Sequence, residues 1–166
     1  MDEVKPIGKD ASGHDDITKA VKELLNKFPG IGDKAILFEE IGASDGIAFY
    51  SNSGPLIMSE RRSITDHIYQ TCQYPFFVIY RSASTREFQK LQVQNFLDTL
   101  GKWLCREPVE INGEDHQLKV YPKLSDNRRI MGISRENPYG LVPNENKSQD
   151  WMLPVTIRYT NEFDMW

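Results

Sequence analysis

Cysteine and histidine are scarce in this sequence, which holds two cysteines and three histidines in 166 residues. Neither a CxxC pair nor an HxxxH pair occurs, so the common sequence patterns of zinc and other metal sites are missing. Two cysteines without an export signal indicate reduced thiols in a cytosolic protein rather than a disulfide framework. We therefore expect no metal and no other cofactor.

Long apolar runs and an excess of basic residues are also missing. Without a run of about 18 apolar residues, the sequence predicts a soluble protein that does not span a membrane. The formal net charge is −4, and Met1–Asp16 alone holds five acids and only two lysines. The remainder is nearly neutral, which argues against a dedicated nucleic-acid binder with a basic, phosphate-neutralising face.

The length of the chain indicates a single domain. A chain of 166 residues can bury roughly two thirds of its unfolded surface in one core and is too short for two ordinary domains. Residues 1–14 contain few apolar groups, so we expect a flexible acidic arm there. The rest, residues 15–166, is expected to form one α+β domain.

Two amphipathic helices are predicted. Apolar residues at helical spacing cover Ile17–Phe28, with Asp15 or Asp16 as the cap and Pro29-Gly30 as the end. A second helix begins at the capping-box pattern Ser84–Glu87 and ends before Pro108. The apolar face of the second helix is expected to consist of Phe88, Leu91, Phe96, Leu97, Leu100, Trp103 and Leu104.

The remaining segments predict a mostly antiparallel β-sheet with both helices packed on one side. Turn residues predict two hairpins, in which Ala35–Ile41 pairs with Gly46–Ser51 and Gln117–Leu124 pairs with Arg128–Ser134. Alternation and β-branched or aromatic content predict further extended segments at Pro55–Ile64, Ile68–Ala83 with Phe76–Tyr80 as a central strand, and Trp151–Phe163. The Pro-, Gly- and Asn-rich loop Glu136–Asp150 is long enough to predict an interaction surface.

Candidate catalytic groups stand apart from one another in the sequence. The histidines His14, His67 and His116 are scattered through an arm, a strand and a loop, with no indication that one pairs with a thiol. Cys72 and Cys105 are interpreted as small core hydrophobes.

Two other patterns also have structural interpretations. Glu39-Glu40 could hold a cation with Asp45, but adjacent strand residues face opposite sides. The glycines of Pro29–Lys34 follow a helix instead of preceding one, as a phosphate loop would. We therefore expect a protein that is not an enzyme.

Three features are candidates for contacts with other proteins. They are the pair Arg61-Arg62, the pair Arg128-Arg129, and the aromatic C-terminal end with Met165 and Trp166. Arginine pairs also occur on exposed strands that resist edge-to-edge pairing, and the C-terminal end could fold back onto the domain. Trp151, at the start of the last predicted strand, completes the set of candidate interface residues.

The element order, together with the segments Pro75–Arg81, Leu91–Leu104 and Val155–Tyr159, suggests a family. Over roughly Ile17–Phe163 the chain resembles small minor capsid proteins of long-tailed phages and prophages of Gram-positive bacteria, which are similar to the tail-terminator fold. Such proteins form a ring, typically of six subunits, that caps the tail tube and joins it to the head. The chain departs from a minimal terminator in its long Ile111–Ser134 and Glu136–Asp150 regions.

The resemblance implies partners and a location. The partners would be further copies of the chain, the tail-tube protein and head-completion proteins, with DNA only passing through the lumen. The protein would be found in the host cytoplasm during assembly and in the neck of the finished virion. Two alternatives stay open at this point, namely a monomeric or dimeric non-catalytic adaptor and a small enzyme whose site leaves no sequence pattern.

Overall fold

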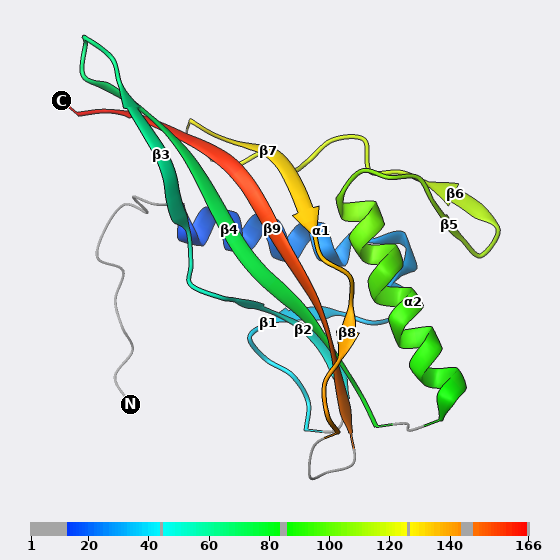
Figure 1. Ribbon diagram of the computed structural model, residues 1–166. Coiled ribbons are helices and arrows are strands. Elements are labelled where there is room, and N and C mark those ends of the chain that lie inside the picture. Colours follow the sequence, from blue (N-terminus) through cyan, green and yellow to red (C-terminus); the bar gives the residue numbers. More distant parts are fainter. Residues whose placement is uncertain (1–12, 44, 84–85, 126, 144–147, 166) are drawn as a thin grey trace.

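The computed structural model describes residues 13–43, 45–83, 86–125, 127–143 and 148–165. It confirms an α+β fold with a mostly antiparallel sheet (Figure 1). The elements in chain order are α1 His14–Asn26, a 3₁₀ turn Pro29–Ile31, β1 Ile36–Phe38, β2 Gly46–Ser51, β3 Leu56–Arg62, β4 His67–Ser82, α2 Glu87–Leu104, β5 Val109–Ile111, β6 Glu114–His116, β7 Arg128–Arg135, β8 Tyr139–Gly140 and β9 Gln149–Asp164.

Two long strands, β4 and β9, form the centre of the sheet. Each has 16 residues, and they pair antiparallel from His67 opposite Asp164 to Ser82 opposite Gln149. Two shorter strands flank each long one: β2 and β3 pair with successive halves of β4, and β7 and β8 do the same along β9. The predicted central position of Phe76–Tyr80 is confirmed.

Each long strand contains a proline at the point where its flanking partner changes. Pro75 lies between the β3-paired and β2-paired parts of β4, and Pro154 lies between the β7-paired and β8-paired parts of β9. Their carbonyls accept hydrogen bonds from Asn52 and Glu136, so the side that lacks an N–H faces connecting segments. Proline is tolerated there because no ladder donor is required.

The predicted hairpin between Ala35–Ile41 and Gly46–Ser51 is wrong, because β1 and β2 pair in parallel. A side chain of α1 holds β1 in this place. Asn26 Oδ1 accepts from the Ile36 N–H at 2.8 Å, and Asn26 Nδ2 donates to the Ile36 carbonyl at 2.9 Å. These bonds satisfy the backbone groups of Ile36 on one edge of β1 and leave the other edge for β2.

The second predicted hairpin is also wrong, because Gln117–Leu124 is irregular and β7 pairs with β9. Tyr121 holds this segment against the end of α2, where its hydroxyl donates to the Leu104 carbonyl at 3.0 Å. A hairpin forms earlier, between β5 and β6. Its turn residues Asn112 and Gly113 both have positive φ, which an Asn-Gly pair adopts readily.

Helix α1 begins before the predicted cap. Its N-cap is Gly13, and Asp15 and Asp16 lie in the first turn. Asp16 instead accepts a hydrogen bond from the Ser125 N–H at 2.9 Å. The expected boundary of the arm therefore moves, since His14 is already helical, and residues 1–12 of that arm lie outside the described residues.

Helix α2 begins at Glu87 with Arg86 as its N-cap, while Ser84 and Thr85 of the predicted capping box lie outside the described residues. Its buried face holds Val93, Leu97, Leu100, Gly101, Trp103 and Leu104. Phe88 and Leu91 do not belong to that face, because they are 67% and 55% exposed. Figure 1 shows the reason, since the first turns of α2 lie away from the strands.

Both helices cover the same face of the sheet, as predicted. The hydroxyls of Thr18 on α1 and Tyr74 on β4 are hydrogen-bonded at 3.0 Å. On α2, Gly101 approaches so closely that a Cβ there would collide with Arg135 of β7. The alternation predicted for Trp151–Phe163 is confirmed from Trp151 to Tyr159, whose odd-numbered residues are buried. Neither described helix has the length and apolar character needed to cross a membrane.

Candidate functional site

One end of the sheet extends beyond the helices and carries exposed apolar side chains. We call it the projecting end and define it as β3, the turn Ser63–Asp66, His67–Gln73 of β4 and Thr160–Met165. Figure 1 shows these strands continuing past the N-terminus of α1. All seven residues of β3 are exposed, and Ile64 in the turn is completely so.

The strand β3 is an edge strand with apolar side chains on its surface. It pairs with β4 on one side, and no other strand of the described residues pairs with its outer side. Leu56, Ile57 and Met58 are 42%, 56% and 55% exposed. An edge of this kind presents backbone donors and acceptors beside apolar side chains, which suits the addition of a strand from another chain.

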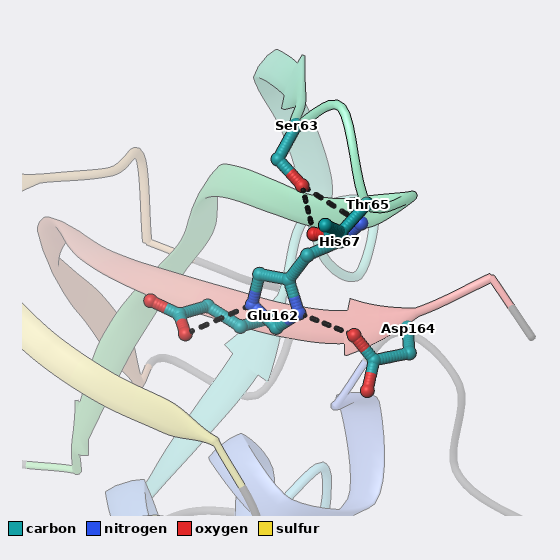
Figure 2. Close-up of polar contacts among 5 residues, drawn as sticks. All are labelled: Ser63, Thr65, His67, Glu162 and Asp164. Carbon is teal, nitrogen blue, oxygen red and sulfur yellow. Dashed lines mark hydrogen bonds and ion pairs between the residues drawn. The ribbon is translucent and has the colours of Figure 1, made fainter.

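His67, Glu162 and Asp164, which we call the histidine clamp, join the start of β4 to the end of β9 (Figure 2). His67 Nδ1 lies 2.7 Å from Asp164 Oδ1, and its Nε2 lies 3.3 Å from Glu162 Oε2. The hydrogen bond with Asp164, and then the one with Glu162, raises the pKa of His67 above 6.5. The protonated ring donates from both nitrogens, so it clamps the end of β9 to the start of β4.

The same geometry bears on what His67 can do chemically. Both ring nitrogens are occupied by carboxylates, so neither faces an adjacent nucleophile. The Ser63 hydroxyl is 3.0 Å from the Thr65 hydroxyl and accepts from the His67 backbone N–H at 3.1 Å (Figure 2). A nucleophile–base pair would need the hydroxyl to contact the imidazole. The arrangement fits a clamp.

Three of the predicted interface residues lie together at the projecting end. Arg61 places its guanidinium carbon 5.0 Å from the centre of the Tyr69 ring, an exposed cation–π contact. Arg62 forms an ion pair with Asp66 at 2.6 Å. Met165 is 45% exposed, and its N–H donates to the Asp66 carbonyl. Trp166, which follows Met165 in the sequence, lies outside the described residues.

Arg128 is not an exposed interface residue, in contrast to its neighbour Arg129. It is buried and donates to Asn161 Oδ1 at 3.1 Å and to Asp16 Oδ2 at 3.4 Å. Asn161 in turn donates to Gln70 Oε1 at 3.2 Å. The physical reason is that a charge can be buried when ionic and polar partners surround it, and α1 and β9 supply them.

Trp151 is the second correction among the predicted interface residues. It is 7% exposed and belongs to the hydrophobic core. Alternation along β9 places it on the helix-covered face with Leu153 and Val155. Its large apolar surface stabilises the fold and is not available to a partner in this conformation.

Sequence reasoning missed the clamp. Period-two spacing does place His67 with Tyr69, and Glu162 with Asp164, on one face of their strands. Nothing local in the sequence indicates that these pairs, separated by more than 90 positions, are cross-strand neighbours. Only the pairing register of β4 and β9 brings them together.

Cys72 is a core residue, as predicted, whereas Cys105 is only partly buried and does not belong to the core. Burial raises the pKa of both Cys72 and Cys105 above the ordinary value for cysteine, which favours the protonated thiol. Within the described residues, no group of three histidine, cysteine or acidic side chains is placed to hold a metal ion.

Comparison with known proteins found no matching family model and no matching curated sequence. The projecting end, with its exposed edge strand and its histidine clamp, is therefore the basis on which a function can be proposed.

Proposed function

We propose that this protein is a structural, tail-terminator-like neck protein that oligomerises into a ring, caps a phage tail tube and joins it to the head. The observation that carries the assembly part of the proposal is the exposed apolar edge of β3. The ring, the tail tube and the head come from the resemblance of the sequence to minor capsid proteins. No catalytic step is part of the proposed role.

The sequence of β3 divides the strand into two parts. Leu56, Ile57 and Met58 are apolar, whereas Ser59–Arg62 is polar and ends in charged residues. Charged side chains protect an edge against pairing with other chains, and exposed apolar side chains do not. A partner strand would therefore pair along Leu56 and Ile57, with the register shift at Met58 and the charged part beyond it limiting its extent.

A ring requires that each copy use two different surfaces, one for each neighbour. Such head-to-tail contacts close when the rotation between copies divides a full turn. The edge of β3 would supply one surface, and its partner must be a different part of the next copy. The nearly neutral body would let DNA pass through a lumen without tight binding.

The oligomeric state tests this proposal. Light scattering coupled to size exclusion and negative-stain microscopy should show a ring for the wild type and smaller species for Ile57→Lys, which places a charge on the edge. Leu91→Lys is a matched control, because Leu91 is also an aliphatic residue and is 55% exposed, but it lies on α2. Binding to a purified tail-tube protein should follow ring formation.

A strict monomer at high concentration that does not bind tail-tube protein would overturn the proposal. A stable monomer or dimer that captures an unrelated protein from the host would instead support the adaptor alternative. An Ile57→Lys variant that still forms the wild-type ring would show that assembly does not use the β3 edge.

A further inference from the structure

A second surface, away from the projecting end, has a strong charge of one sign. A groove of about 520 Å³ lies between the irregular segment Lys119–Leu124 and the start of β7. We call it the basic groove. Among the described residues, its lining holds five cationic side chains and no acidic one: Arg106, Lys119, Lys123, Arg128 and Arg129.

Four of these five cations have no carboxylate partner in the described structure; Arg128 alone is engaged, with Asp16. Lys119 Nζ donates to the neutral Gln117 Oε1 at 3.1 Å, and the Arg106 guanidinium carbon lies 5.7 Å from the centre of the Tyr121 ring. Val120 and Met131 add exposed apolar surface, at 76% and 50%. The groove therefore suits an acidic segment with some apolar surface.

The chain itself carries an acidic segment of matching character in the β5–β6 hairpin. Glu107, Glu110, Glu114 and Asp115 are exposed on it or beside it, and Figure 1 shows the hairpin at the edge of the molecule, beyond the end of α2. Glu110 and Asp115 are direct cross-strand partners. Two like charges in that position destabilise a hairpin, and a basic partner would relieve the repulsion.

The turn and the two ends of the hairpin are both held in place, so the hairpin forms a rigid unit. Its turn is a two-residue Asn112-Gly113 connection with positive φ at both positions, which matches the twist of the paired strands. Gln117, just after β6, donates from its side chain to the Arg106 carbonyl at 2.8 Å, which ties the two ends of the hairpin together. None of the hairpin residues lines the groove of its own chain.

We propose that the β5–β6 hairpin of one copy docks into the basic groove of the next copy, with Glu110 and Asp115 facing Lys123 and Arg129. The contact is head-to-tail, since each copy offers a hairpin to one neighbour and a groove to the other. It rests on the proposed function in one respect, because it supplies a contact that a ring of copies needs. Within the described residues of one chain, Glu110, Asp115, Lys123 and Arg129 form no ion pair, and the docking would pair them.

Charge reversal tests the docking directly. Glu110→Lys/Asp115→Lys and Lys123→Glu/Arg129→Glu should each raise the dissociation constant for self-association on the order of 100-fold, because like charges then meet across the contact. An equimolar mixture of the two variants should assemble again, with copies alternating. A chain that carries all four reversals should assemble alone. Lys22→Glu/Glu23→Lys, on the exposed side of α1, is the matched control and should assemble as the wild type does.

The outcomes separate the docking from the proposed function. A wild-type ring that persists in both reversal variants overturns the docking and leaves the ring function standing. The wild type could instead form open chains or dimers that dissociate in the reversal variants and form again in the mixture. That result would support the docking and contradict a ring. Loss of assembly in both variants without recovery in the mixture overturns the docking, provided that thermal unfolding shows both variants folded.

Discussion

Along the β4–β9 pair, the half that the helices cover and the projecting end differ in what occupies the helix-facing side of the sheet. In the covered half, Phe76 lies opposite Val155 and Val78 opposite Leu153, and all four are almost completely buried. Near the projecting end, the equivalent pair on the same side is Gln70 opposite Asn161, which are joined by a hydrogen bond. Apolar pairs give way to a satisfied polar pair where the helix layer ends.

The comparison also shows where apolar surface remains exposed. In the covered half, the apolar side chains on the helix-facing side of the sheet are buried under α1 and α2 and stabilise the fold. At the projecting end, exposed apolar side chains lie on β3 and the adjoining turn, where they contribute little to the stability of the isolated chain. The difference suggests that the covered half determines whether the chain folds and the projecting end determines what it binds.

Adjacent phenylalanines on β4 offer the largest test of this contrast. Phe76 is 1% exposed and faces the helices, whereas Phe77 faces the other side and stacks on Tyr50 with ring centres 5.9 Å apart. Phe76→Ala should lower the free energy of unfolding by about 3–5 kcal/mol, because it leaves a cavity in the core. Phe77→Ala should cost about 1 kcal/mol. Urea denaturation measures both, and equal losses would contradict the division between the two faces.

Adjacent arginines on β7 give the next largest effect. Arg128→Ala should cost about 3 kcal/mol, because it removes the buried cationic partner of Asp16 and the guanidinium that donates to Asn161 Oδ1. Arg129→Ala, at an exposed position, should change the free energy of unfolding by less than about 0.5 kcal/mol. Thermal unfolding monitored by circular dichroism checks the pair. If Arg128→Ala left the free energy of unfolding unchanged, water would be replacing the guanidinium at little cost.

The histidine clamp gives the smallest effect and the only one that depends on pH. Because the folded state raises the pKa of His67, its contribution to stability is complete below the unfolded pKa of about 6.5 and is lost as the pH rises through the folded value. Asp164→Asn should lower the pKa of His67 more than Glu162→Gln does, since Asp164 is the larger cause. NMR titration of the His67 ring protons measures both variants, and an unchanged pKa in Asp164→Asn would rule out the clamp.

Several elements could be predicted from local patterns because neighbouring residues carry the information. Alternation along Trp151–Phe163 and helical spacing along Ile17–Phe28 each identified the correct element and buried side. The β1–β2 connection could not be predicted in this way, because its parallel pairing depends on Asn26 of α1 holding Ile36. Arg128 and Trp151 were wrongly predicted to be exposed. Their burial depends on the helices and strands that pack over them, which their neighbours in the sequence do not indicate.

The sequence by itself determined the class of the fold, because the periods of apolar residues record which side of each helix or strand is buried. It also determined the charge of the β5–β6 hairpin and of the segment around Lys119–Arg129. The tertiary structure alone decided that His67 meets Asp164, that Arg128 is enclosed, and that the β3 edge and the basic groove remain open. The physical reason is that pairing register and layer coverage arise from contacts between residues far apart in the chain, which no local pattern encodes.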